Sequence, residues 1–119
     1  MWTYDQSTGA LSRDGAPIGD GYSGFESGKN NPEMQNVHDV GPIPQGRYEI
    51  GPPHDTTTHG PHVLPLTPLD GTDTFGRDGF LIHGDSIAHP GAASHGCIIL
   101  SRDLRNLISD SGDPELEVV

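Results

Sequence analysis

The stretch from Phe80 to Leu100, FLIHGDSIAHPGAASHGCIIL, contains two apolar runs separated by a polar, glycine-rich loop. The runs are residues 80–82 and 98–100, and short bounded apolar runs are typical of buried strands. His83 directly follows the first run, and Cys97, the only cysteine in the chain, precedes the second. If the two strands pair as neighbours, both side chains meet at the same end of the sheet. A lone cysteine near a histidine is a candidate nucleophile with its general base.

The loop between the two runs supplies further groups that such chemistry needs. Gly96 has no Cβ, so a substrate can approach the backbone at this point. We expect the N–H groups of Gly96 and Cys97 to face a developing oxyanion. His95 lies too close to Cys97 in sequence to share the role of His83. We therefore expect His95 to add a donor or to orient the loop.

Two other interpretations of this stretch remain open. A lone cysteine is often a small buried hydrophobe, although the nearby histidines argue against that role here. Zinc binding is the other, because the stretch contains ligand types that zinc accepts, but their spacing matches no common zinc motif. These candidate ligands are His83, Asp85, His89, His95 and Cys97. A second histidine-rich stretch, HDTTTHGPH at residues 54–62, is interpreted as a solvated loop, with substrate contact as the alternative.

Length and composition predict one small domain, residues 1–119, with much of its chain in turns. The chain has 119 residues, of which 17 are glycine, 11 are proline and only 31% are hydrophobic. The net charge of −11 disfavours binding to nucleic acid or to anionic membranes. A single cysteine excludes an intrachain disulfide, and no apolar run is long enough to span a membrane. The N-terminus has neither the basic nor the apolar segment of a signal peptide.

Outward from the central stretch, local patterns predict mainly strands. Residues 2–12 are expected to form a hairpin, with a second turn at Asp14-Gly15. Residues 47–50 alternate as a half-buried strand does, and residues 63–69 are expected at a sheet edge because they contain two prolines. Ser101 is a candidate N-cap for a helix over residues 102–109, whose apolar face is Leu104, Leu107 and Ile108. Residues 116–119 predict a final strand.

Several motifs together resemble the L,D-transpeptidase (YkuD-type) catalytic domain family. That family has a His-Gly step, then a loop, then Ser-His-Gly-Cys, and this chain has Ile82-His83-Gly84 followed by Ser94-His95-Gly96-Cys97-Ile98. The stretches that resemble a compact branch of the family are Asn30-Asn31-Pro32, residues 40–48 (VGPIPQGRY) and residues 76–85 (GRDGFLIHGD). This branch includes type VI secretion effectors that act on peptidoglycan in rival bacteria.

The resemblance implies a mainly β fold, an L,D-transpeptidase-like β-sandwich with one short C-terminal helix. It implies that Cys97 is the nucleophile and His83 the base, with His95 as a supporting donor and Ser94 and Gly96 in the nucleophile loop. The substrate would be a peptidoglycan stem tetrapeptide, whose terminal D-alanine is released through a thioacyl-enzyme. The acceptor would be water, a D-amino acid or a second stem, and no cofactor or metal is expected.

One position departs from the family pattern. Many transpeptidases carry arginine two residues after the cysteine, where this chain has Ile99. The substrate carboxylate would then be held from elsewhere, by Arg77, Arg102 or Arg105. The residues expected to contact the substrate are Arg77, Arg102, Asp85 and Tyr48.

The resemblance also bears on delivery and partners. A small enzyme without a signal peptide would be made in the bacterial cytoplasm, secreted by a type VI system and active in the periplasm of the target cell. Such a toxin implies a cognate immunity protein. The alternatives to this function are a zinc-dependent amidase or peptidase, and a non-catalytic module that binds the cell wall.

Overall fold

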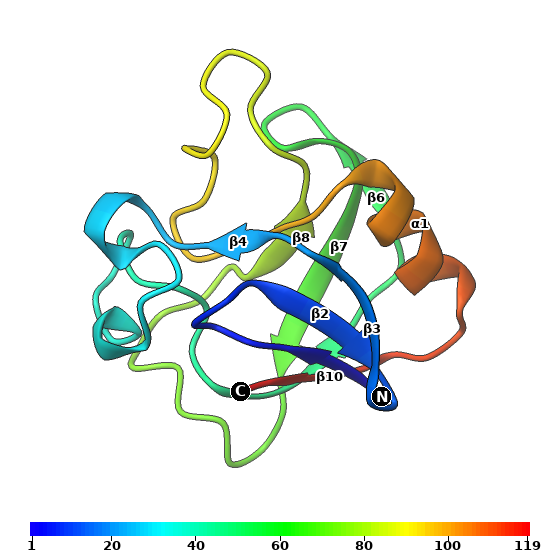
Figure 1. The fold of residues 1–119 in the computed structure, drawn as a ribbon, viewed down its shortest axis with the longest axis horizontal. Coiled ribbons are helices and arrows are strands. Elements are labelled where there is room, and N and C mark those ends of the chain that lie inside the picture. Colours follow the sequence, from blue (N-terminus) through cyan, green and yellow to red (C-terminus); the bar gives the residue numbers. More distant parts are fainter.

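The computed structural model describes residues 1–119 as a strand-rich fold with one α-helix, α1 (Arg102–Asp110) (Figure 1). Two short 3-10 helices, η1 (Glu26–Gly28) and η2 (Pro32–Met34), lie before the fifth strand. The strands are β1 (Trp2–Tyr4), β2 (Ala10–Arg13), β3 (Ala16–Asp20), β4 (Tyr22–Ser23), β5 (Gly46–Ile50), β6 (His54–Thr56), β7 (Gly60–Pro68), β8 (Leu81–His83), β9 (Ile98–Ile99) and β10 (Glu115–Val118). The expected mainly β fold with one short helix near the C-terminus is confirmed.

The strands form one path of hydrogen-bonded neighbours in the order β3-β2-β1-β10-β5-β7-β8-β9-β4, with β6 paired to β7 off this path. Strand β7 links the two halves of the path, because its C-terminal half pairs with β5 and its middle pairs with β8. Buried side chains from both halves belong to one hydrophobic cluster, including Tyr4 and Leu116 from one half and Leu64 and Ile82 from the other. The two halves therefore cover a common core, as in a β-sandwich.

The central position of β7 corrects the prediction of an edge strand. A strand residue directs its N–H and its C=O to the same side, and the Pro65 carbonyl accepts a hydrogen bond from the Gly51 N–H at 2.8 Å. Gly51 lies just beyond the end of β5. The N–H that Pro65 lacks would therefore point to the place where the hydrogen bonds between β5 and β7 stop. Pro68 lies at the last position of β7. Both prolines thus avoid the ladder positions that need a donor.

Most local expectations agree with the structure. Strands β1 and β2 form the predicted hairpin, and Asp14-Gly15 makes the next turn with both residues at positive φ. Helix α1 is capped by Ser101, whose Oγ accepts from the Leu104 N–H. Its predicted apolar face needs one correction, because Leu107 is exposed, and Arg105 is buried on the helix together with Ile108. No helix of this fold combines the length and the apolarity needed to cross a membrane.

The fold brings the two apolar runs of the central stretch together. Strands β8 and β9 pair in parallel, with Ile82 opposite Ile98 and His83 opposite Ile99. The Leu100 N–H also donates to the His83 carbonyl at 3.1 Å. The two strands are neighbours, but their parallel direction corrects the expectation that both side chains lie at the same end of the sheet: His83 ends β8, whereas Cys97 precedes the first residue of β9. The loop over residues 84–96 projects from their ends, beside the turn that joins β6 to β7 (Figure 1).

Candidate active site

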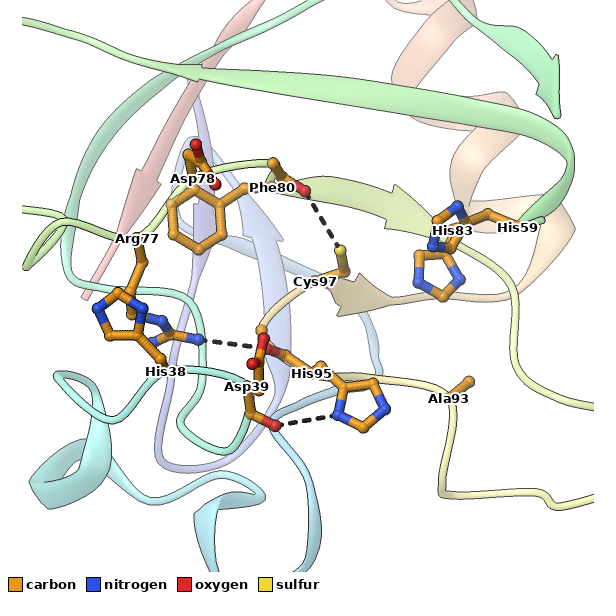
Figure 2. Close-up of a pocket in the computed structure, with 12 residues that line it drawn as sticks. His38, Asp39, His59, Arg77, Asp78, Phe80, His83, Ala93, His95 and Cys97 are labelled. Atoms are coloured by element: carbon orange, nitrogen blue, oxygen red, sulfur yellow. Dashed lines mark hydrogen bonds between the residues drawn. The ribbon is translucent and has the colours of Figure 1, made fainter.

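Cys97 and His83 line one cavity of about 240 Å³ at the ends of β8 and β9. Alternate residues of a strand face the same side of a sheet. The register aligns His83 with Ile99, two residues beyond Cys97, so His83 and Cys97 lie on one face. Figure 2 shows the thiol of Cys97 between Phe80 on one side and His83 on the other. The side chains drawn around them come from three further segments, at residues 38–39, 59 and 77–80.

His83 is held in the tautomer that a general base requires. Its side chain is only 3% exposed, and its Nδ1 lies 2.8 Å from the Gly84 carbonyl oxygen. A carbonyl only accepts, so this contact places a proton on Nδ1 and leaves Nε2 free to accept one. Burial lowers the pKa of His83 below its usual 6.5, and the positive charge of Arg105 acts in the same direction. The ring is therefore neutral at pH 7.

The thiol of Cys97 is protonated before it reacts. Burial raises its pKa, although the Leu81 N–H and the positive charge of Arg77 oppose that shift. The Sγ–H points to the Gly79 carbonyl oxygen at 3.8 Å (Figure 2). A neutral thiol beside a neutral imidazole needs proton transfer to become nucleophilic. A neutral thiol beside a neutral imidazole fits general-base activation of the sulfur better than a preformed thiolate.

Ser94 and Gly96 shape the loop that presents Cys97. Ser94 is fully buried, and its Oγ accepts from the Gly24 N–H and donates to the Cys97 carbonyl at 2.6 Å. The Gly96 N–H lies 3.2 Å from the same Oγ. The prediction that this N–H faces an oxyanion is therefore wrong, because the loop itself uses the donor. Ser94 lies outside the cavity lining and acts as a positioning residue.

Position 96 admits only glycine in this backbone. Its φ is +135°, in the left-handed region that favours glycine, and an added Cβ would lie 2.4 Å from Arg77 Nη2. His95, the preceding residue, is exposed at the cavity wall, where its ring packs against Phe25. Its Nδ1 lies 2.9 Å from the Asp39 carbonyl oxygen. Nδ1 therefore carries the proton, and the ring is fixed by groups far away in the sequence.

Arg77 joins the nucleophile loop to the segment before β5. Its guanidinium is buried and donates to four main-chain carbonyl oxygens, those of Gln35, Gly41, Pro42 and His95. Burial lowers the pKa of this guanidinium, but arginine stays charged in proteins. The expected contact between Arg77 and a substrate carboxylate is not supported, because these carbonyls already occupy its donors. Arg77 lines the cavity as a positioning residue whose charge favours the thiolate of Cys97.

We expect Arg77→Met to lower the free energy of unfolding by about 2–4 kcal/mol, because buried carbonyls lose a charged donor. Chemical denaturation followed by circular dichroism measures this change. Arg47→Met is the matched control. Arg47 is exposed, and its Nη2 lies 3.8 Å from Glu115, so the control should change stability by less than about 0.5 kcal/mol. Equal effects of the two substitutions would contradict the role assigned to Arg77.

Comparisons with known proteins agree with this fold and site. The sequence matches the family model of the Tlde1 domain over residues 18–111. The chain belongs to the Tlde1 domain family. Among the solved structures that match is the crystal structure of Mycobacterium tuberculosis L,D-transpeptidase 1, with a TM-score of 0.54 and 19% sequence identity over 99% of this chain. The chain spans 60% of the length of that structure. No curated protein matches the sequence.

Both findings confirm the resemblance to L,D-transpeptidase catalytic domains of the YkuD type. The family match covers every residue of the central stretch, including Cys97 and His83. The shared fold extends over nearly the whole chain, although identity at this level carries only the fold. The chemistry of this Tlde1 domain is therefore argued from its own residues.

Three of the expected substrate contacts lie outside the Cys97 cavity of this Tlde1 domain. Tyr48 is 0% exposed and donates its hydroxyl to the Pro44 carbonyl, so no substrate reaches it. Arg102 is exposed on α1 and bonds to Asn106. Asp85 lines an adjoining cavity, where its carboxylate accepts from Tyr22, Ser86 and Gly91. For Tyr48 and Arg102, proximity to the motifs in sequence does not become proximity to Cys97 in space, whereas Asp85 stays beside His83 with its carboxylate bonded within the protein.

Several residues that line the Cys97 cavity were not predicted as site residues from the sequence, among them His38, Asp39 and His59, the last from the stretch for which substrate contact was the alternative. The ring centroid of His59 lies 4.7 Å from that of His83, and His59 lines the Cys97 cavity (Figure 2). The expectation of a solvated loop at residues 54–62 is corrected, because β6 and β7 form a hairpin whose turn reaches the end of β8. The Thr-His-Gly sequence before β7 is a weak turn signal. Nothing local indicates which strand the turn approaches.

The histidine-rich segments do not gather into a metal centre. No group of three His, Cys, Asp or Glu side chains lies close enough together to hold a metal ion. His62, for example, has its Nε2 2.7 Å from Ser109 Oγ. The zinc alternative therefore finds no ligand set in this Tlde1 domain.

Proposed function

We propose that this Tlde1 domain cleaves peptidoglycan stem tetrapeptides with Cys97 as nucleophile and releases the terminal D-alanine. One observation carries the proposal: the Cys97 thiol shares a cavity with His83, whose protonated Nδ1 leaves Nε2 as the free base. Membership of the Tlde1 family and the fold shared with an L,D-transpeptidase support this substrate class.

The reaction begins when His83 Nε2 takes the thiol proton as Sγ attacks the carbonyl carbon on the L-centre of the diamino acid. The tetrahedral intermediate collapses, and the bond from carbon to the D-alanine nitrogen breaks. His83 returns its proton to that nitrogen, so D-alanine leaves and a thioester remains on Cys97. General acid–base catalysis of this kind contributes about 10²–10⁴-fold to rate.

The second half of the reaction regenerates the thiol. An acceptor attacks the thioester carbonyl, and His83 Nε2 takes its proton and passes it to the departing sulfur. Water as acceptor makes the enzyme an L,D-carboxypeptidase. A D-amino acid gives exchange, and the amine of a second stem gives a cross-link. Exclusion of water from the site governs the choice among these acceptors.

We also infer that the protein acts as a type VI secretion effector with a cognate immunity protein. The Tlde1 family match supports delivery by that route. The net charge of −11 favours a basic protein surface as the partner. An immunity protein that covers the Cys97 cavity would neutralise the activity.

The test is to incubate the purified protein with tetrapeptide stems, with and without an added D-amino acid, and to identify products by mass spectrometry. Loss of D-alanine without the additive, and its exchange with the additive, supports the proposal. Activity that a chelator removes would favour the zinc amidase or peptidase. Retained binding of stems with no product and no effect of alkylating Cys97 would favour a wall-binding module.

The pH profile of this reaction follows from His83. Its neutral form is the base, and burial lowers its pKa below 6.5. The value of kcat/KM is therefore expected to stay near its maximum as pH falls through 6.5 and to decline only at more acid pH. Initial rates measured across an acid series check this. A half-maximal rate at or above pH 6.5 would contradict it.

A further inference from the structure

A second cavity continues the Cys97 cavity beyond His83. Its volume is about 580 Å³, and it shares His59, His83 and Ala93 with the first cavity. The remaining walls come from the β6–β7 turn, the segment after His83 and helix α1. The two hollows thus form one path on which a bound peptide can extend past the base.

Arg105 is the only residue of α1 in this wall, and one of its nitrogens lacks a partner. The side chain is 6% exposed. Its Nε donates to the Ser101 carbonyl, and its Nη1 donates to the carbonyls of Pro61 and His62. Nη2 makes no hydrogen bond, and no carboxylate pairs with the guanidinium. Nη2 is not itself a buried atom, so a ligand in the second cavity can reach it.

The surrounding charges leave this cation uncompensated. The charged group that acts on the pKa of Arg105 is another cation of the same helix, Arg102. Neither of the helix carboxylates, Asp103 and Asp110, pairs with Arg105. Asp85 also lines the second cavity, but its carboxylate is occupied by the Tyr22 hydroxyl and by two N–H groups of its own loop. A ligand carboxylate can therefore meet Arg105 without displacing a protein anion.

Gly84 keeps the free nitrogen open to the cavity. An added Cβ at position 84 would lie 3.1 Å from Arg105 Nη2. That separation is closer than ordinary van der Waals contact, so a side chain would cover the donor. Ile99, which lies opposite His83 in the neighbouring strand, is buried at 3% exposure and offers no charge. Arg105 is the arginine that remains available beside the base.

We propose that Arg105 Nη2 binds a free carboxylate of the peptide substrate in the second cavity. This assignment rests on the proposed function, because the substrate is taken to be a stem tetrapeptide. Such a peptide offers two carboxylates near the scissile bond, one on the terminal D-alanine and one on the side chain of the diamino acid. Charge-assisted hydrogen bonds to guanidinium suit either group.

The test compares the wild type with Arg105→Met, Arg105→Lys and Gly84→Ala on three peptides. One peptide has both carboxylates free, one has the terminal carboxylate amidated, and one has the side-chain carboxylate amidated. On the free peptide, we expect Arg105→Met to raise KM by about 10- to 100-fold with little change in kcat. Gly84→Ala should act in the same direction, because Arg105 remains but its Nη2 is covered.

The amidated peptides identify which carboxylate is bound. Amidation of the recognised group should raise KM for the wild type by a similar factor and should have little further effect in Arg105→Met. Arg102→Met, which removes an exposed charge from the same helix, is the matched control and should leave KM near the wild-type value. If Arg105→Met equals this control, or if the wild type does not distinguish the three peptides, the proposal is wrong.

A binding measurement separates this proposal from the proposed function. In a Cys97→Ala background, calorimetric titration of the same peptides requires no turnover. Weaker binding after the Arg105 substitution supports carboxylate recognition even if the wild type cleaves no tetrapeptide. Equal binding of free and amidated peptides overturns it even if cleavage occurs. Circular dichroism checks that each variant is folded. If Arg105→Met does not fold, the comparison rests on Arg105→Lys and Gly84→Ala, which both retain a cation at position 105.

Discussion

Cys97→Ala is expected to reduce release of D-alanine from a stem tetrapeptide by at least about 10³-fold, because removal of a covalent nucleophile leaves only binding and electrostatic contributions. The thiol is the only one in the chain, so no second sulfur can replace it. Its neighbour Ser94 is fully buried, and its Oγ bonds within the loop. Ser94 therefore cannot serve as a substitute nucleophile. Steady-state assay of D-alanine measures the loss.

The substitution separates chemistry from folding. Cys97 is only partly buried, and its Sγ has two main-chain neighbours, the Gly79 carbonyl at 3.8 Å and the Leu81 N–H. The alanine variant should therefore unfold at nearly the wild-type denaturant concentration. It should also lose the adduct that mass spectrometry detects when the wild type is stalled with substrate. Undiminished release of D-alanine by the variant would exclude the cysteine mechanism.

His83→Gln is expected to lower kcat by about 10²–10⁴-fold, the usual contribution of a positioned general base. The burial that raises the pKa of the Cys97 thiol makes this base necessary. Glutamine keeps a hydrogen-bonding side chain of similar length but cannot take up the thiol proton at neutral pH. The rate of Cys97 alkylation by iodoacetamide should fall in parallel, and this readout does not depend on the substrate.

The matched control for His83 is His89→Gln. His89 is an exposed histidine in the same loop and does not line the Cys97 cavity. Its substitution should leave both kcat and the alkylation rate near their wild-type values. If His83→Gln instead retains normal alkylation and normal kcat, another group activates the thiol. His59, whose ring packs against His83, would then be the next candidate.

Local sequence was sufficient to predict those structural features that depend only on residues adjacent in the chain. The Asp14-Gly15 turn and the Ser101 N-cap were both predicted correctly, because positive φ and capping depend on residue type at one or two positions. The sequence left the pairing of the strands around Cys97 as a condition, and it did not indicate their parallel direction. The position of β7 was not predicted correctly, because pairing between distant strands overrides the local preference of proline for edges.

The roles of the arginines could not be predicted for the same reason. Arg77 and Arg105 look alike in sequence, yet the donors of Arg77 end on four carbonyls from residues 35–42 and 95. Arg105 keeps Nη2 free. Those acceptors come from segments whose distance from each arginine is set only by the packed sheet. A charged residue near a motif is therefore a poor guide to substrate contact.

The sequence by itself identified the family, which the Tlde1 match confirms, and it predicted Cys97 as nucleophile and His83 as base, because both lie in a short stretch whose residue types suit that chemistry. Only the tertiary structure decided the protonation states of these two side chains and which further residues surround them. Contact with the Gly84 carbonyl places the His83 proton on Nδ1, and burial keeps thiol and imidazole neutral. The β6–β7 hairpin and α1 add His59 and Arg105 to the walls around the base. These features depend on burial and on contacts between distant segments, which no local pattern encodes.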